Sequence, residues 1–286
     1  MRRYTIQWFL LFILLGTVGR AEIATSTGKN VGTSQSIAQS NRQITGTAGV
    51  NEFDRTLIAS VNQYSQRSRV FDKTIDLLSK NHLFKGGVFM TLFWWLWFRG
   101  DGLQAVRRTH ILITLGVSVV NMAFVRVIAL MAPLRLRPLY EPGLGFRIPL
   151  GENPHALDGW SSFPSDHAGL FFGLATGLLF VSRRIGVFTL IYTTVFIALP
   201  RIYLGLHYPT DILVGAISGI GLTLAANFYL AQRPAVQVVM GWSNKSPGEF
   251  YAIFFLFTFQ VADMFDNVRS IFEALYGFLR TVTGHS

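Results

Sequence analysis

Residues 111–133 read ILITLGVSVVNMAFVRVIALMAP, an apolar run with a single charged residue, Arg126. A helix needs about 20 predominantly apolar residues to cross the hydrocarbon core of a bilayer, and this run is long enough. A charge inside such a run is costly to hold there, so Arg126 is a candidate functional residue. The run therefore predicts a membrane-spanning helix, and with it the class of the protein.

The composition of the whole chain agrees with a membrane protein. Of its 286 residues, 50% are hydrophobic and only 14% are charged, and the mean hydropathy is +0.39. The formal net charge of +10 comes from basic residues in short loops between apolar runs. That pattern fits an anionic lipid surface or a phosphorylated substrate, and we expect no nucleic-acid partner. The absence of cysteine excludes Cys-ligated zinc, disulfides and thiol nucleophiles.

Four further apolar runs flank the first. They cover residues 83–98, 167–182, 186–202 and 211–231. If each run crosses the bilayer, the fold is an all-α, polytopic membrane helix bundle with about five or six spans after an N-terminal signal or anchor. The run 250–261 is either a sixth span or an interfacial helix, and both remain open at this point.

The ends of the chain differ in composition from the bundle. Residues 1–21 combine two early arginines, an apolar stretch and Gly19-Arg20-Ala21, which predicts a signal peptide or an uncleaved signal anchor. Residues 22–50 are rich in Ser, Thr, Gly, Gln and Asn, which predicts a flexible linker. Residues 232–286 form a C-terminal hydrophobic and amphipathic segment.

Residues 52–231 make up the membrane domain itself. Its first part, 52–80, mixes apolar and charged residues in a way that predicts amphipathic helices at the membrane surface. A tryptophan cluster, Trp94 to Trp97, is typical of an interfacial aromatic belt. The small residues of Gly215-x3-Gly219 are typical of two helices that approach closely.

Basic residues in the short loops predict the orientation. Arginines follow the runs 83–98, 167–182 and 211–231, which are the first, third and fifth in chain order. They are Arg99, Arg107, Arg108, Arg183, Arg184 and Arg233. Because cytoplasmic loops are enriched in Lys and Arg, these loops should face the cytoplasm. The loops 134–166 and 203–210 should then face the periplasm or the cell exterior.

Three polar clusters lie in these two outer loops, each at the end of an apolar run. They are Arg135-Leu136-Arg137-Pro138, then Ser162-Phe163-Pro164-Ser165-Asp166-His167, then Arg201 with His207 and Asp211. Taken alone, each has an ordinary explanation, such as contacts of Arg135 and Arg137 with lipid headgroups. Together they gather the residue types that phosphate chemistry needs.

The third cluster places a histidine and a carboxylate about one helical turn apart. Pro209 suits the first turn of a helix, so we expect His207 just before that helix and Asp211 inside its first turn. The Asp211 carboxylate can then accept a hydrogen bond from one ring nitrogen of His207. That contact would fix the tautomer and leave the other ring nitrogen free to attack phosphorus.

The other two clusters can bind the anion. Pro164 is expected to open a helix whose unpaired N–H groups near Ser165 and Asp166 point at a phosphate. Arg137 and Arg201 supply planar donors that match phosphate oxygens. This set needs no metal or organic cofactor.

The ordered motifs Arg-Pro, Pro-Ser-Asp-His and Arg-x5-His-x3-Asp resemble the signature of the type-2 phosphatidic acid phosphatase superfamily, over about residues 52–231. The resemblance implies that His207 is the nucleophile, that Asp211 orients it, and that His167 protonates the leaving oxygen and later activates water. It also implies that Arg137, Arg201 and Ser165 bind phosphate, and the backbone near Asp166 is expected to join them through its N–H groups.

The wording of the second and third motifs is most similar to that of the bacterial undecaprenyl-diphosphatase branch. This implies a lipid diphosphate as substrate and a multi-pass protein of the bacterial inner (plasma) membrane, with its active site facing outward. Two other functions remain open. One is a phosphotransferase that uses the same site, and the other is a catalytically impaired protein that binds lipid phosphate.

Two positions depart from the family pattern. The lysine usually found seven positions before the arginine of Arg-Pro is Leu130 here, and the serine usually before the third-motif arginine is Pro200. Arg126, one turn before Leu130, is our first candidate to replace the missing charge, and Arg135 is the second. An alternative for Arg126 is that it snorkels or pairs inside the bundle.

Overall fold

The computed structural model describes residues 50–155 and 157–267. Residues 50–262 form one compact unit, and the described residues 263–267 belong to another. The predicted signal segment, all but the last residue of the predicted linker, and residues 268–286 lie outside the described residues.

Every regular element in this part of the chain is a helix, which confirms the all-α class. The α-helices are α3 (Glu52–Asn62), α4 (Arg69–Lys80), α5 (Val88–Phe98), α6 (Gln104–Met131), α7 (Asp166–Val181), α8 (Arg183–Tyr192), α9 (Leu199–Tyr203), α10 (Pro209–Leu230), α11 (Pro234–Lys245) and α12 (Pro247–Ala262). Two π-helical turns, η1 (Leu83–Gly87) and η4 (Thr193–Ala198), and two 3₁₀ turns, η2 (Pro138–Tyr140) and η3 (Pro142–Leu144), complete the order.

The predicted apolar runs all become helices. Residues 104–131, 183–203 and 209–230 are long and apolar enough to cross a bilayer, and 83–98 and 166–181 are shorter apolar helices. These five segments coincide with the five apolar runs of the sequence, although their ends differ by up to two turns.

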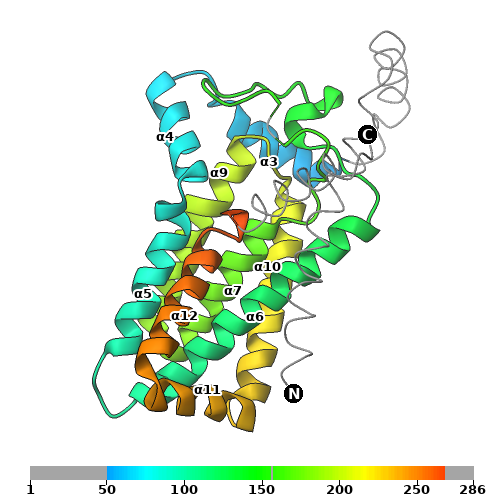
Figure 1. Cartoon of the computed structure of the whole chain (residues 1–286). Helices are drawn as coiled ribbons and strands as arrows, with labels where there is room; N and C mark the ends of the chain where they lie inside the picture. The colour runs from blue at the N-terminus through cyan, green and yellow to red at the C-terminus, as the bar shows by residue number, and fades with distance from the viewer. Residues whose placement is uncertain (1–49, 156, 268–286) are drawn as a thin grey trace, which may run out of the picture. The chain divides into compact units, whose positions relative to one another are not determined.

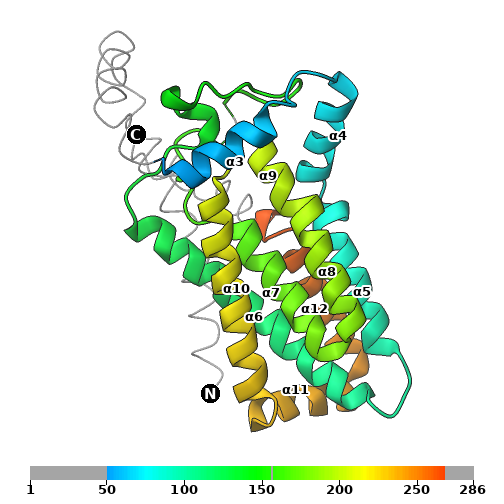
Figure 2. The same cartoon turned by 180° about the vertical axis from the view of Figure 1, so that it is seen from behind.

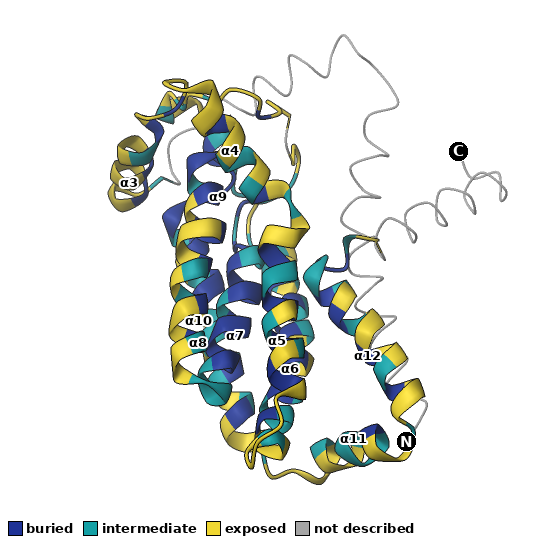
Figure 3. Ribbon diagram, turned by 90° about the vertical axis from the view of Figure 1, so that its left-hand side faces the viewer, coloured by how far each residue is buried: buried dark blue, intermediate teal, exposed yellow. Residues whose placement is uncertain are grey.

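Helix α7 lies in the middle of the bundle and contacts α5, α6, α8 and α10 (Figures 1 and 2). Most of its side chains are buried, as Figure 3 shows by colour. A helix that is apolar on all sides needs such a central position, because every face must be covered. The second polar motif immediately precedes α7, so the core of the bundle positions it.

Helices α7 and α10 approach each other very closely, as predicted. A Cβ atom added to Gly215 would lie 2.3 Å from the carbonyl oxygen of Ser165, and one added to Gly219 would lie 2.1 Å from that of Gly169. Only glycine fits at such backbone contacts. This packing holds the start of α7 against the start of α10, and so brings the second and third motifs together.

The tryptophan cluster differs from the prediction. Trp97 is fully buried and stacks on Phe250 of α12, Trp94 packs against Phe254, and only Trp95 is largely exposed. The cluster is therefore mainly an interface between α5 and α12 and not an aromatic belt. At the other end of α5, Gly86 lies against Ala262, so α12 runs antiparallel to α5 along its length. Among the described residues, α12 is not one of the helices that are long and apolar enough to cross a bilayer, so its direction does not decide between a sixth span and an interfacial helix.

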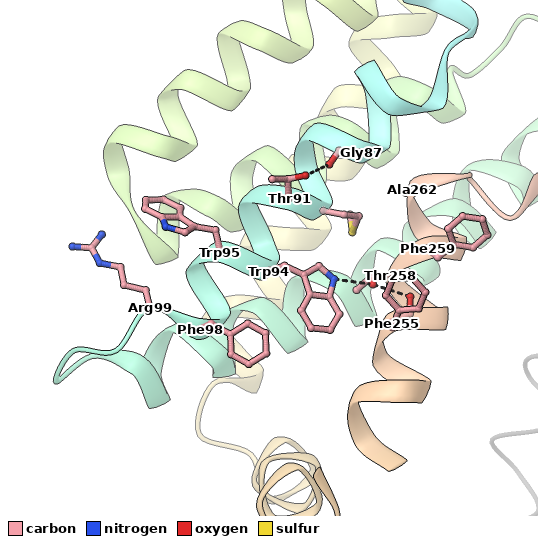
Figure 4. A pocket seen from close by; sticks show the side chains of 11 residues that line it. Gly87, Thr91, Trp94, Trp95, Phe98, Arg99, Phe255, Thr258, Phe259 and Ala262 are labelled. Atoms are coloured by element: carbon pink, nitrogen blue, oxygen red, sulfur yellow. Dashed lines mark hydrogen bonds between the residues drawn. The ribbon is translucent and has the colours of Figure 1, made fainter. Parts of the chain in front are cut away.

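A cavity of about 950 Å³ lies between these two helices (Figure 4). Five of its eleven lining residues are aromatic, namely Trp94, Trp95 and Phe98 of α5 and Phe255 and Phe259 of α12. Within it, the Trp94 indole N–H donates to the Thr258 hydroxyl over 3.1 Å, which satisfies a polar group among apolar neighbours.

The predicted amphipathic helices are α3 and α4, at the end of the bundle where α9 lies (Figures 1 and 2). Both begin at side-chain caps, Asn51 and Ser68. They hold the loop before α7, since the Asn62 side-chain amide exchanges two hydrogen bonds with the backbone of Arg147. The Asp72 carboxylate accepts from the backbone N–H of Leu150. The two helices therefore form a support for the loops that carry the motifs.

This arrangement places the arginine-rich connections α5–α6, α7–α8 and α10–α11 at the end opposite to α3 (Figure 1). We predict that His155→Cys, in the exposed loop before α7, will react with a membrane-impermeant thiol reagent in intact cells. Leu103→Cys, at the other end, should react only after lysis. The parent chain has no cysteine and is the blank. The reverse labelling pattern would contradict the orientation inferred from the arginines.

Candidate active site

Four segments that are distant in sequence meet at the α3 end of the bundle. They are the loop after α6, the approach to α7, helix α9 and the turn before α10. The polar side chains that they bring together are mostly buried, including Arg137, Ser165, Arg201, His207 and Asp211. A buried group of this kind is expected at a site that binds a charged ligand.

His207 lies in the turn before α10 and is 3% exposed. Its Nδ1 is 2.7 Å from the carbonyl oxygen of Ser162, so Nδ1 carries the hydrogen and donates it. In this tautomer the Nε2 lone pair remains available. Burial, and then the cations Arg137 and Arg201, hold the pKa of His207 well below its usual range. The ring therefore stays neutral, and hence nucleophilic, at pH 7.

Asp211 takes a different place from the one expected. Pro209 opens α10 and Asp211 lies in its first turn, as predicted, but the Asp211 Oδ2 atom is 3.9 Å from His207 Nδ1. That oxygen instead accepts from the backbone N–H of Tyr208 over 2.8 Å and closes a capping box. The hydrogen bond that selects the tautomer of His207 thus goes to the Ser162 carbonyl, because that oxygen is closer.

Arg135 joins two buried carboxylates. Its Nη1 donates to Asp211 Oδ1 over 2.5 Å, and its Nη2 donates to Asp54 Oδ2 over 2.8 Å. Asp54 also accepts from the backbone N–H and the hydroxyl of Thr210, and the guanidinium lies 4.0 Å from the Tyr208 ring centroid. Arg135 is therefore neither a lipid-headgroup contact nor a spare phosphate ligand.

Asp54 was not identified from the sequence. It is one of two acidic residues on an amphipathic helix, and nothing in its spacing links it to residues 135 or 211. Only its complete burial distinguishes it, and burial of a lone carboxylate requires a partner of opposite charge.

Arg137 and Arg201 are the two buried guanidinium groups of the site. Arg137 donates from Nη1 to the Leu206 carbonyl over 2.5 Å and from Nη2 to the Ser161 carbonyl over 3.1 Å. The Nε–H groups of both arginines are buried without an acceptor among the described residues. Burial lowers the pKa of Arg137 to about 10, so it remains charged at pH 7. Two fixed cations with unused donors make this a suitable site for an anion.

His167 lies in the first turn of α7, within contact of Arg201. Its Nδ1 is 2.9 Å from the Asp166 carboxylate, which leaves Nε2 as the acceptor in the neutral ring. Arg201 Nη2 donates to that Nε2. Asp166 therefore fixes the tautomer of His167. This is the role that the sequence predicted for Asp211 toward His207.

The start of α7 differs from the prediction. The helix begins at Asp166 with Ser165 as its N-cap, so Pro164 precedes the helix and does not open it. The Ser165 N–H donates to the Asp211 carbonyl, and the N–H groups of His167 and Ala168 donate to the side chains of Asp166 and Ser165. These three amides already have acceptors within the protein, so they do not contribute to the expected cradle of free N–H groups. The Ser165 hydroxyl can still donate its own hydrogen.

Lys85 is a second residue that sequence reasoning missed. It lies in the π-helical turn η1, is 4% exposed, and places Nζ 3.4 Å from His167 Nε2. A signal was present in the sequence, because a lysine within the apolar run 83–98 is costly unless it has a function. Arg126, by contrast, lies with its guanidinium 4.1 Å from the ring centroid of Trp160, in the loop before α7.

Comparison with known proteins agrees with the motifs. A family model described as the PAP2 superfamily matches residues 111–234. The protein YbjG of Escherichia coli (strain K12), provisionally named an undecaprenyl-diphosphatase, is 32% identical over 128 residues, which are 44% of this chain and 57% of that protein. The undecaprenyl-diphosphatase BcrC of Bacillus subtilis (strain 168) is 35% identical over 88 residues, 30% of this chain and 44% of that protein.

The chain thus spans little more than half of the first relative and less than half of the second. A crystal structure of a transmembrane PAP2-type phosphatidylglycerolphosphate phosphatase from Bacillus subtilis aligns with 80% of this chain and 97% of that one. Its sequence identity is 18% and its TM-score is 0.28, which is too low for a shared fold to be argued from it.

The buried contact of Arg135 with two carboxylates generates a stability prediction. Asp54→Asn should lower the free energy of unfolding by about 2 kcal/mol, since loss of one partner leaves a buried charge only half compensated. Chemical denaturation of the full chain in detergent measures this. Glu52→Gln, on the exposed face of the same helix, is the matched control and should leave the midpoint unchanged. Equal midpoints for the two variants would show that the contact contributes nothing.

Proposed function

On the premise that its residues 111–234 make this chain a member of the PAP2 superfamily, we propose that it is a membrane phosphatase that hydrolyses a lipid phosphate or diphosphate. The observation that carries the proposal is the state of His207. Its Nδ1 donates to Ser162, its ring is held neutral, and two buried arginines with unused donors flank it. This is the arrangement that a histidine nucleophile needs for attack on an anionic phosphoryl group.

In the first half-reaction, His207 Nε2 attacks the phosphorus in line with the leaving oxygen. The P–N bond forms as the P–O bond breaks, and the electron pair of the P–O bond stays on the leaving oxygen. Arg137, Arg201 and the Ser165 hydroxyl stabilise the charge on the three equatorial oxygens. Where the leaving oxygen needs a proton, His167 first takes up a proton from solvent at Nε2, in place of the contact with Arg201, and then gives that proton to the leaving oxygen.

In the second half-reaction, His167 accepts a proton from water as the water oxygen attacks the phosphohistidine. The P–N bond breaks, its electron pair returns to His207 Nε2, and inorganic phosphate departs. The contact of His167 Nδ1 with Asp166 supports this role, because the carboxylate stabilises the imidazolium that forms. Asp211 makes no direct hydrogen bond to His207 in this mechanism. It fixes the start of α10 and, through it, the position of His207.

A lipid substrate is supported by the location of the site at one end of a bundle of apolar helices. Undecaprenyl diphosphate is our first candidate, since two relatives carry that activity in their names. We further propose a bacterial inner membrane as the location, with the site facing the periplasm or cell exterior, in agreement with the arginine distribution.

The test uses the full chain in detergent micelles with excess chelator. Undecaprenyl diphosphate, phosphatidic acid and phosphatidylglycerophosphate are supplied in parallel, and released inorganic phosphate is measured. We expect release from at least the first substrate, together with a phosphohistidine at His207 after a rapid alkaline quench. His207→Ala should lose both while its thermal unfolding stays within a few degrees of wild type, and His155→Ala, at an exposed loop histidine, should lose neither.

Each other outcome has a defined meaning. Transfer of phosphate to a second lipid without release would favour a phosphotransferase. Binding without either reaction would favour a lipid-phosphate-binding protein. Turnover by His207→Ala near the wild-type rate would refute the phosphohistidine mechanism.

Another prediction concerns the positive charge of the family lysine, which Leu130 replaces in this chain. If Arg126 contacts the substrate phosphate, Arg126→Leu should lower kcat/KM on the order of a hundredfold, and Leu130→Lys should restore part of it. Arg233→Leu, at an exposed arginine beyond α10, is the control. Because Arg126 lies against Trp160, the activity of Trp160→Leu is measured as well, to separate a contact with phosphate from support of the loop. A similar loss in that variant would mean that Arg126 supports the loop, and full activity of Arg126→Leu would refute both roles.

A further inference from the structure

We propose that Tyr203 and Asp72 are positioning residues, whose hydrogen bond holds the turn that carries both Arg201 and His207 in place against the rest of the site. This inference rests on the proposed function. Asp72 belongs to α4 and lies outside the three sequence motifs and outside the PAP2 match at 111–234. Tyr203 lies inside that match, but in the interval between Arg201 and His207 to which the third motif assigns no role.

The first step is the environment of the Asp72 carboxylate. Asp72 lies in the first turn of α4 and is completely buried, so its oxygens need donors within the protein. Its Oδ1 atom accepts a hydrogen bond from the Tyr203 hydroxyl, which also lies 3.5 Å from the Tyr64 carbonyl oxygen. Its Oδ2 atom accepts from the backbone N–H groups of Gln66 over 3.1 Å and Leu150 over 2.8 Å. One carboxylate thus joins α4 to the loop before α7 and to the end of α9.

The second step is the path from Tyr203 to the site. Tyr203 is the last residue of α9, two positions after Arg201. The Arg201 carbonyl oxygen accepts from the backbone N–H groups of Leu206 over 3.0 Å and His207 over 3.3 Å. Residues 201–207 therefore form a closed turn that contains Tyr203. Movement of Tyr203 displaces Arg201 and His207 with it, or opens the turn.

The third step is how the two parts of this turn are held. Its later part is held by the loops of the first two motifs, since the Leu139 N–H donates to the Gly205 carbonyl over 3.1 Å and His207 Nδ1 donates to Ser162. Its earlier part belongs to α9, which packs against α3 and α4. There the Tyr203 hydroxyl makes the contact with Asp72. We therefore expect Asp72 to set the position of the α9 part of the turn.

The fourth step separates the ring of Tyr203 from its hydroxyl. The ring packs edge-on against Phe71, with 5.5 Å between the centroids, and Tyr203 belongs to an apolar cluster with Leu204 and Leu206. Phenylalanine would keep this packing, because it lacks only the hydroxyl. The ring is therefore sufficient for the turn to fold, whereas the hydroxyl determines its placement.

The fifth step is the sensitivity of phosphoryl transfer to placement. In the proposed mechanism, His207 attacks in line while Arg201 stabilises an equatorial oxygen, and both must keep their positions relative to Arg137 on another loop. A misplacement of about 1 Å can cost on the order of a hundredfold in rate. The substrate would still meet the same charges in a displaced site. Loss of the contact should therefore slow the chemical step more than it weakens binding.

The first experiment measures kcat and KM of the full chain in detergent with undecaprenyl diphosphate. Tyr203→Phe should lower kcat by about tenfold or more and leave KM within about twofold of wild type. Its thermal unfolding midpoint should stay within a few degrees of wild type, because the ring is retained. Tyr251→Phe is the matched control and should keep the wild-type kcat. The Tyr251 hydroxyl also joins two helices, since it accepts from the Trp97 indole N–H over 3.1 Å.

Asp72→Asn tests the other partner of the contact. Asparagine keeps one acceptor oxygen and replaces the other by a donor, so it cannot accept from both the Tyr203 hydroxyl and the backbone N–H groups. It should therefore reproduce the loss of kcat. If the two residues act through one contact, the double variant should lose no more than the more affected single variant.

Hydrogen exchange provides a measurement that does not depend on turnover. The N–H groups of Leu206 and His207 donate to Arg201 inside the turn, so their exchange reports whether the turn opens. In a peptide that covers residues 201–208, exchange should be roughly tenfold faster in Tyr203→Phe and Asp72→Asn than in wild type, and unchanged in Tyr251→Phe. If wild type releases no phosphate from any lipid, the proposed function fails, and exchange still decides whether the contact holds the turn.

Three results would overturn the proposal. Wild-type exchange in both single variants, whatever their kcat, would show that the contact does not hold the turn. An unchanged kcat in Tyr203→Phe of an active enzyme, with or without a raised KM, would show that the placement of the turn does not limit the chemistry. Loss of folding in both single variants would make the contact a part of the fold alone, and where only one of them folds, that variant decides.

Discussion

The active site depends on one buried ionic contact, in which Arg135 joins Asp54 and Asp211. Asp54 belongs to a surface helix, Arg135 to the loop after α6, and Asp211 to the first turn of α10. Each is expensive to bury alone, and together they satisfy one another and Thr210. Arg137 follows Arg135 by two residues and His207 precedes Asp211 by four. The contact therefore fixes the distance between Arg137, the proposed phosphate ligand, and His207, the proposed nucleophile.

Backbone carbonyl groups set the fine geometry around this contact. The Ser162 oxygen selects the tautomer of His207, and the oxygens of Leu206 and Ser161 hold the guanidinium of Arg137. All three belong to the loops that precede α7 and α10. Those loops are held together because Gly215 and Gly219 allow the two helices to touch at backbone distance. A packing feature in the middle of the bundle thus controls the orientation of side chains at its end.

The electrostatic pattern of the site is asymmetric. Arg137, Arg201 and Lys85 are three buried cations, and each of the two histidines lies near two of them. In the proposed mechanism, the same field that keeps His207 neutral attracts the anionic substrate, so one set of charges serves both binding and activation of the nucleophile.

The sequence by itself determined the membrane class, the five apolar helices and the three motifs, because apolar length and local spacing are properties of contiguous residues. It also predicted that Pro209 opens a helix with Asp211 in its first turn, since capping is local. It did not identify Asp54 or Lys85 as partners of the site, although Lys85 stands out as a charge within an apolar run. Their contacts join residues more than 80 positions apart, and only packing makes them neighbours.

The tertiary structure likewise decided between contacts that the sequence allowed equally. Asp211 lies one helical turn from His207, as spacing predicted, yet the nearer Ser162 carbonyl takes the ring hydrogen. The position of Arg135 in the sequence made it a candidate phosphate ligand, but its guanidinium binds two buried carboxylates. Spacing can bring a group within reach, but the choice of partner follows from distance and burial, and these exist only once the helices have packed.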